Sequence, residues 1–394
     1  MGAPMYTVMN KIRACRKGLQ SWSRQHFGNI RKQITKVENL LRQTEAESMQ
    51  GFNHDHYRHL KGRLKDLLRK EERLWRQRSR AKWLKAGDQN TRYFHCRATQ
   101  RKRRNQVYRL KDPNGMWTTS QSQVPQLFIN YYSSLFTTSN PALIDPVVEN
   151  IVPSVATEMN SRLVSEFTAA EVTQALKQMA PLKAPGPDGL PPVFYQRYWH
   201  LIGEDITAAV LSSLNSGKIL KAINHTHVTL IPKVKNLEAV TEFRPISLCN
   251  VIYKIISKVL ANRLKIILPQ IVSESQSAFV PGRLITNNIL VAFETLHHMQ
   301  HQRRGKFGSM ALKLNMSKAY DQVEWKYLKC VMERMGFHPK WVSLMMECIS
   351  TVSYSILVNG EPHGYIQPSR GLRQGDPLSP YLFLLYAEGL HSLI

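Results

Sequence analysis

Residues 371–380, Gly-Leu-Arg-Gln-Gly-Asp-Pro-Leu-Ser-Pro, decide how the C-terminal part of this chain is interpreted. They form a polar, glycine-containing loop ahead of an apolar run. Asp376 is expected to be a helix N-cap and Pro377 the first helical residue. Upstream, residues 312–321 (Leu-Lys-Leu-Asn-Met-Ser-Lys-Ala-Tyr-Asp) predict a strand that breaks into a helix.

Strand and helix patterns surround these two segments. Strands are predicted at 227–233, 243–248 and 309–316 and in a hairpin at 353–368, with amphipathic helices at 252–268 and 287–299. Because the strands and helices do not strictly alternate, the pattern predicts an α+β fold. Further upstream, Thr168 and Glu171 predict a capping box at the start of a helix over 168–178.

The N-terminal part is helical and basic. Two amphipathic patterns lie between residues 8 and 84, and the polar break at 51–54 separates them, which predicts an antiparallel helical hairpin. A coiled-coil spacer would have the same periodicity. Residues 1–115 hold 29 of the 54 basic residues and only 9 of the 28 acidic ones. This imbalance favours a polyanionic partner, and nucleic acid is the commonest.

Basic and aromatic residues interleave between Trp75 and His95, and a further basic run follows. Cations neutralise phosphates and aromatic faces stack on unpaired bases, so this mixture predicts RNA binding. The candidate nucleic-acid-binding residues are Lys82, Trp83, Lys85, Arg92, Arg101, Lys102, Arg103 and Arg104. The run from Arg101 to Arg104 fits a nuclear-localisation signal equally well.

Five scattered cysteines are too few for a disulfide framework and are not spaced as zinc ligands, so a reducing compartment is expected. No apolar run is long enough to cross a bilayer, and no secretory signal is visible. We therefore expect an intracellular protein, in the nucleus, the cytoplasm or both, with no membrane partner.

Four segments together carry a family resemblance: Arg244–Leu248, Gln276–Arg283, Asn315–Asp321 and Arg373–Pro380. In order and spacing they resemble successive motifs of the reverse transcriptases of LINE-type non-LTR retrotransposons, the plant forms above all. Residues 83–88 and 183–190 (Lys-Ala-Pro-Gly-Pro-Asp-Gly-Leu) resemble the region before the polymerase; spacing alone makes 183–190 only a rigid turn.

The resemblance implies a fold and a domain order. Residues 221–394 are expected to form the fingers and an incomplete palm of a right-hand polymerase. Residues 116–220 would be a pre-polymerase linker or N-terminal extension, and residues 1–115 the basic, mainly α-helical, nucleic-acid-binding region.

The resemblance also implies roles for single residues. Lys233 and Arg244 match residues that grip the triphosphate of the incoming dNTP, which suits their charge and the arginine fork. Tyr320 matches the side chain that blocks a 2′-hydroxyl, and Gln374 and Gly375 match the loop against nucleotide and template. By residue type alone these would be surface cations, a core tyrosine and a glycine at a helix start.

The same family uses two Mg²⁺ ions held by carboxylates. Asn315 stands where the family has its first metal-binding aspartate, and a neutral amide lacks the anionic charge that holds Mg²⁺. The sequence contains no Asp-Asp dipeptide, and it ends before the family's Ala-Asp-Asp hairpin would follow. We therefore expect no intact catalytic residue, no productive Mg²⁺ binding and no polymerisation.

Three functional hypotheses remain open at this point. The first is an inactive remnant of a retroelement reverse transcriptase, with element RNA, target-site DNA and dNTP as the family's partners. The second is a domesticated RNA-binding or splicing-type protein that kept the basic helices and the fingers. The third is an unstable product of a decayed element, whose apolar surface would be left uncovered.

Overall fold

The computed structural model describes residues 4–26, 28–49, 53–79, 91–120, 122–301 and 309–393. Contacts divide the chain into two compact units. The smaller unit holds residues 14–108 and 234–237, and the larger holds residues 1–13, 109–233 and 238–394. Helices and sheet are mixed, as the sequence predicts. The three-domain division stays a prediction; residues 116–220 and most of 221–394 lie within the larger unit.

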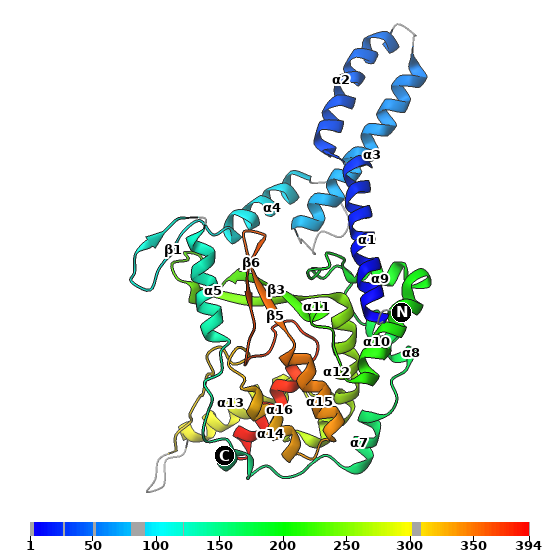
Figure 1. Cartoon of the computed structure of the whole chain (residues 1–394). Coiled ribbons are helices and arrows are strands. Elements are labelled where there is room, and N and C mark those ends of the chain that lie inside the picture. The colour runs from blue at the N-terminus through cyan, green and yellow to red at the C-terminus, as the bar shows by residue number, and fades with distance from the viewer. Residues whose placement is uncertain are drawn as a thin grey trace. The chain divides into compact units, whose positions relative to one another are not determined.

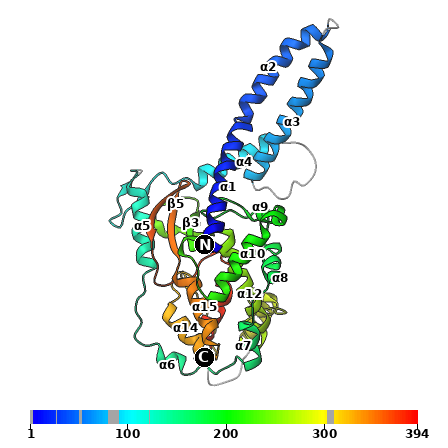
Figure 2. The same cartoon turned by 45° about the vertical axis from the view of Figure 1, so that its right-hand side comes forward.

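Helices make up the smaller unit. Helix α1 (Pro4–His26) begins in the larger unit, and α2 (Ile30–Met49), α3 (His54–Ser79) and α4 (Thr91–Asn105) follow in the smaller one. Helices α2 and α3 run side by side (Figures 1 and 2), and their buried contacts are Ile34, Val37, Leu60 and Leu67. The predicted antiparallel hairpin is confirmed.

A four-stranded sheet lies in the larger unit, in the order β4-β3-β5-β6. Its strands are β3 (His225–Pro232), β4 (Phe243–Cys249), β5 (Ser353–Val358) and β6 (Glu361–Ile366). Strand β3 pairs antiparallel with β4 and parallel with β5, and β5 and β6 form the predicted hairpin. The short strands β1 (Leu110–Lys111) and β2 (Trp117–Thr118) form a separate hairpin.

Twelve α-helices are assigned in the described part of the larger unit after α1. They are α5 (Gln123–Leu135), α6 (Asp145–Val148), α7 (Thr157–Val164), α8 (Ala169–Lys177), α9 (Pro192–Arg197), α10 (Trp199–Ser216), α11 (Lys221–Asn224), α12 (Val251–Ile271), α13 (Ile285–His301), α14 (Trp325–Arg334), α15 (Pro339–Ser350) and α16 (Ser379–His391). A one-turn 3₁₀ helix, Val240–Glu242, precedes β4. None of the helices that are described is long and apolar enough to cross a membrane.

Helix α12 is the centre of the core. Tyr253, Ile256, Leu260 and Leu264 are fully buried, and α12 contacts α7, α8, α10, α11 and α16. A helix that is apolar on nearly all sides must be surrounded by other elements, which explains why its neighbours come from distant parts of the sequence.

The segment Ser309–Met316 corrects one prediction, because it is irregular rather than a strand. Its alternating side chains Met310, Leu312 and Leu314 are 87%, 75% and 64% exposed. Alternation fits a strand, but a strand is stable only with a partner, and no strand of the described residues pairs with this one. The helix expected directly behind it is also shorter, because residues 317–322 form turns and α14 starts at Trp325.

Candidate nucleotide and nucleic-acid site

The two segments that identify the fold lie against each other. The Leu372 N–H donates to the Tyr320 carbonyl at 2.7 Å, and the Gly371 N–H donates to the Val323 carbonyl at 2.8 Å. Gly371 has φ +95°, and a Cβ there would lie 2.8 Å from the Asp321 carbonyl oxygen. Only glycine fits this close approach without strain, so the loop is fixed onto the turn that follows Asn315.

The same loop continues along the edge strand β4. The Ser247 N–H donates to the Gln374 carbonyl at 2.8 Å. A Cβ on Gly375, whose φ is +106°, would lie 3.3 Å from the Ser247 carbonyl oxygen. Gln374 and Gly375 are therefore held beside the strand that carries Arg244.

Lys233 and Arg244 lie at one end of the β3–β4 hairpin. Ile231 pairs with Arg244, and the Lys233 N–H donates to the Glu242 carbonyl at 2.9 Å. Both side chains are exposed. The Lys233 ammonium donates to the Thr241 carbonyl at 2.9 Å, whereas the Arg244 guanidinium has no partner among the described residues. Two exposed cations close together can bind a polyphosphate.

Tyr320 is half-buried, and its ring stacks on Phe383 of α16 with centroids 4.9 Å apart and planes 12° apart. Burial raises the pKa of its hydroxyl. The backbone of Tyr320 binds the loop, while its ring belongs to the apolar contact with α16.

Asp321 is a buried carboxylate with an uncommon environment. It is 5% exposed, and burial raises its pKa to about 6 despite the opposing charges of Lys318 and Lys233. No hydrogen bond to this carboxylate is found among the described residues. The charge effect of Lys233 indicates that the end of β3 and the turn after Asn315 are close in space.

Asp376 corrects a second prediction, since it does not cap the following helix. Helix α16 starts at Ser379, with Leu378 as its N-cap residue. The Asp376 carboxylate is 4% exposed and pairs with the Arg373 guanidinium at 2.9 Å. It also accepts hydrogen bonds from Tyr253 at 2.9 Å and from Ser257. The same carboxylate accepts from the Leu378 N–H at 3.1 Å, so it joins Arg373 to the residue just before the helix.

Arg373 is a positioning residue that sequence reasoning missed. Its guanidinium donates to Asn224 at 2.5 Å and to the Cys348 carbonyl at 3.0 Å, and it lies 3.9 Å from the Tyr253 ring centroid. These contacts join α11, α15 and α12 to the loop. No local signal could have found them, because all three partners are distant in the sequence.

Glu324 is a second missed residue. Its carboxylate accepts from Arg370 at 3.1 Å and from Thr138 at 2.5 Å, and both the N–H and the hydroxyl of Ser139 also donate to it. Burial acts to raise its pKa, but these hydrogen bonds bring the pKa below the ordinary value. The contacts tie the segment after α5 to the start of α14.

The turn 183–190 packs against the junction of β4 and α12. A Cβ on Gly186 would lie 2.5 Å from the Asn250 nitrogen and the Cys249 carbonyl carbon. The Asp188 carboxylate accepts from the Val251 N–H at 3.2 Å, and the Asp188 N–H donates to the Asn250 side chain at 2.9 Å. The turn therefore fixes the start of the central helix.

The residues present do not fit a two-metal site. Asn315 offers an exposed neutral amide, and Asp376 is already neutralised by Arg373. In the part of the chain that the structure describes, no three His, Cys, Asp or Glu side chains gather as metal ligands would. Octahedral Mg²⁺ sites need anionic oxygens, so no chemical step can be assigned to a metal here.

Five of the eight candidate nucleic-acid-binding residues lie on helix α4. Arg92, Lys102, Arg103 and Arg104 are exposed on it, and Arg101 is half-buried. Arg97 lies 5.9 Å from the Tyr93 ring centroid, so a cation and an aromatic face are adjacent on this helix. Lys82, Trp83 and Lys85 lie outside the described residues.

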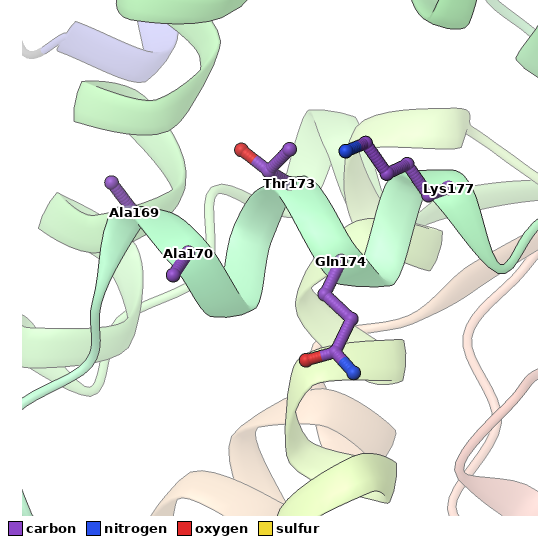
Figure 3. Close-up of a pocket in the computed structure, with 5 residues that line it drawn as sticks. All are labelled: Ala169, Ala170, Thr173, Gln174 and Lys177. Atoms are coloured by element: carbon purple, nitrogen blue, oxygen red, sulfur yellow. The ribbon is translucent and has the colours of Figure 1, made fainter.

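A shallow pocket of about 450 Å³ lies on helix α8 (Figure 3). Its lining follows two neighbouring rows of the helix, Ala169–Thr173–Lys177 and Ala170–Gln174. Lys177 is the only charged group among these five residues, and none of the motif residues lines the pocket. It therefore suggests no chemistry.

Comparisons with known proteins complete the description. Residues 231–394 match the family described as reverse transcriptase (RNA-dependent DNA polymerase). The chain is 27% identical over 366 residues to the transposon TX1 uncharacterized 149 kDa protein of Xenopus laevis, covering 92% of this chain and 27% of that protein. It is 23% identical over 275 residues to the Pol polyprotein of the retrotransposable element R2DM of Drosophila melanogaster, and this match covers 69% of this chain and 24% of that protein.

A shorter match is more identical in sequence. Over 37 residues, 9% of this chain, the identity with the uncharacterized mitochondrial protein AtMg01250 of Arabidopsis thaliana is 65%, covering 30% of that protein. The chain thus spans 30% or less of the length of each of these three relatives.

Proposed function

Because residues 231–394 are a reverse-transcriptase domain of the LINE-type, non-LTR retrotransposon family, we propose that this chain is a polymerase remnant. Its reverse-transcriptase domain forms fingers and palm of a right-hand polymerase, and the chain binds nucleic acid and does not polymerise. The basic helical region precedes these parts in the chain. The observation that supports this most strongly is Asn315, an exposed amide at the position where the resemblance places a metal-binding aspartate.

Nucleotide contact is supported by the arrangement around β4. Arg244 is exposed and unpaired on this strand, Lys233 lies at the same hairpin end, and the backbone of Gln374 is fixed along the strand. These groups suit the triphosphate and base of a dNTP. Tyr320 is held by the same loop, where it would restrict the sugar.

Loss of catalysis follows from charge. Two-metal nucleotidyl transfer needs carboxylates that hold Mg²⁺ against its bound water, and the amide of Asn315 does not supply that charge. Asp321 does not replace it, because its side chain is buried, 5% exposed, whereas Asn315 is exposed. Mg²⁺ is the cofactor of the family, and productive binding by this chain is not expected.

Primer extension tests the loss of catalysis. With an RNA template, a DNA primer, dNTPs and Mg²⁺, the full chain should give no product above a no-protein control. Template-dependent extension by the unmodified chain would contradict the proposal. An active relative assayed in parallel shows that the conditions support synthesis.

A measurement of RNA binding tests the claim that the chain binds nucleic acid. Binding of a single-stranded RNA should weaken steeply with salt, because released counterions dominate phosphate contacts. Replacement of Arg101, Arg103 and Arg104 by Gln should lower the salt slope by about 2, at about 0.7 per phosphate contact. The matched control replaces Arg58, Arg63 and Lys65, which are exposed on α3.

Salt-insensitive or absent RNA binding by the full chain would contradict the proposal. RNA binding without dNTP binding would favour the domesticated RNA-binding hypothesis.

A further inference from the structure

A row of lysines follows one side of the central helix α12. Lys254, Lys258 and Lys265 are separated by 4 and 7 residues, spacings that bring side chains to the same face of a helix. Lys254 is buried, Lys258 is half-buried and Lys265 is exposed. The row is therefore partly inside the fold, unlike an ordinary solvated charged face.

Lys183 joins this row from the turn 183–190. The buried Lys254 ammonium donates a long hydrogen bond, 3.5 Å, to the Ala184 carbonyl, which places the start of the turn beside α12. Lys183 is exposed, and its charge reaches Lys258. We call Lys183, Lys258 and Lys265 the lysine row, and Lys254 its buried anchor.

Among the described residues, no carboxylate neutralises the lysine row. Burial lowers the pKa of Lys258, and the like charges of Lys265 and Lys183 lower it further, with no acidic group acting in the opposite direction. None of the three ammonium groups has a hydrogen-bond or ion-pair partner among the described residues. Asp188 is the nearby acid, but its interaction is with the anchor Lys254.

An unpaired, half-buried ammonium among like charges destabilises the free protein, and a bound anion removes that penalty. From Lys258 to Lys265 the helix rises about 10 Å, at about 1.5 Å per residue. The turn residue Lys183 extends the charged surface. One phosphate group cannot reach all three ammonium groups, whereas the backbone of a nucleic-acid strand presents phosphates in series.

We infer that the lysine row binds the phosphate backbone of an RNA strand. This inference rests on the proposed function and adds a second contact surface, in the larger unit, to the basic residues of α4. Lysine contacts to phosphates carry no information on the bases, so binding by the row is independent of sequence.

The test compares full-length variants in RNA binding over a salt series, with a fluorescein-labelled single-stranded 20-nucleotide RNA as the probe. The variant K183Q/K258Q/K265Q should lower the salt slope by about 2, at about 0.7 per phosphate contact. Its affinity should fall about equally for RNAs of different sequence. The matched control K326Q/K329Q/K340Q removes the same charge from exposed positions on α14 and α15.

A second variant, K183R/K258R/K265R, keeps the charge and should keep the slope of the unmodified chain. Thermal unfolding of each variant shows that it is folded. An unchanged slope in K183Q/K258Q/K265Q, or an equal loss in the control, overturns the inference. If the α4 variant loses RNA binding while K183Q/K258Q/K265Q does not, the proposed function is supported and the inference about the lysine row is wrong. If the unmodified chain binds no RNA, both the proposed function and the inference are wrong.

Discussion

Two buried aspartates near the loop 371–380 have opposite environments. Asp376 is paired with Arg373 and receives hydrogen bonds from two hydroxyls. Asp321 has no such partner, and burial raises its pKa to about 6. A buried carboxylate is stable when its partners satisfy it and is a source of strain when they do not. Asp376 therefore stabilises the loop, and Asp321 destabilises the turn that holds it.

The Asp321→Asn variant should be more stable than the unmodified chain above pH 6. Between about pH 4 and 6 the folded protein binds more protons than the unfolded chain, so its stability falls as pH rises through this window. The pKa shift of about two units corresponds to about 3 kcal/mol at most. Urea unfolding at several pH values measures the difference between variant and unmodified chain.

That difference should grow from pH 4 to pH 6 and stay level above it. A control, Asp205→Asn, alters an aspartate on α10 that is exposed and paired only with the exposed Lys11. A difference that is independent of pH, or a variant less stable at pH 7, would show that Asp321 finds a partner in solution.

At the level of elements, local patterns predicted what local interactions determine. The α2–α3 hairpin follows from apolar periodicity, and the start of α8 from the pair Thr168 and Glu171. The strand predicted at 309–316 was wrong because alternation specifies a face and not a partner. The helix cap predicted at Asp376 was wrong because α16 starts only at Ser379, with Leu378 as its N-cap residue, although the Asp376 carboxylate accepts from the Leu378 N–H at 3.1 Å.

In the candidate site too, some features could be predicted from local sequence and others could not. The sequence motifs singled out the Asn315–Asp321 and Arg373–Pro380 segments, and backbone hydrogen bonds join them through Tyr320 and Leu372. Arg373, Glu324 and the packing of the 183–190 turn involve partners far away in the sequence. A single sequence carries no signal for such contacts.

The capping box of α8 allows an element-scale prediction. The Thr168 hydroxyl accepts from the Glu171 N–H at 3.3 Å, and the Glu171 carboxylate accepts from the Thr168 N–H at 2.9 Å. Thr168→Ala should lower the free energy of unfolding by about 1 kcal/mol. Glu171 also binds Arg263 of α12 at 2.6 Å, so the cap holds α8 against the core.

Denaturant unfolding of the Thr168→Ala variant measures this loss. The matched control is Thr173→Ala in the middle of the same helix, where alanine is the better helix former and stability should fall less or rise. Equal losses at the two positions would contradict a capping role.

For the whole molecule, uncovered apolar surface and net charge act against each other. Helix α13 has no buried residue. Its large exposed side chains are Ile285, Ile289, Leu290, Val291, Phe293 and Leu296. An apolar surface of this extent favours association. The formal net charge of +26 opposes it by repulsion.

These opposing effects of apolar surface and net charge predict self-association that increases with salt concentration. Raising ionic strength shortens the range of the charge repulsion and leaves apolar contact in place. Sedimentation should therefore show larger species at 500 mM NaCl than at 50 mM NaCl.

The variant L290Q/F293Q should shift this association to higher protein concentration without lowering the thermal midpoint, because neither side chain is buried. The control L143Q/L201Q removes two other exposed leucines, 77% and 71% accessible, and should leave association unchanged. A chain that stays monomeric at 500 mM NaCl would show that α13 is covered in solution by residues of the same chain.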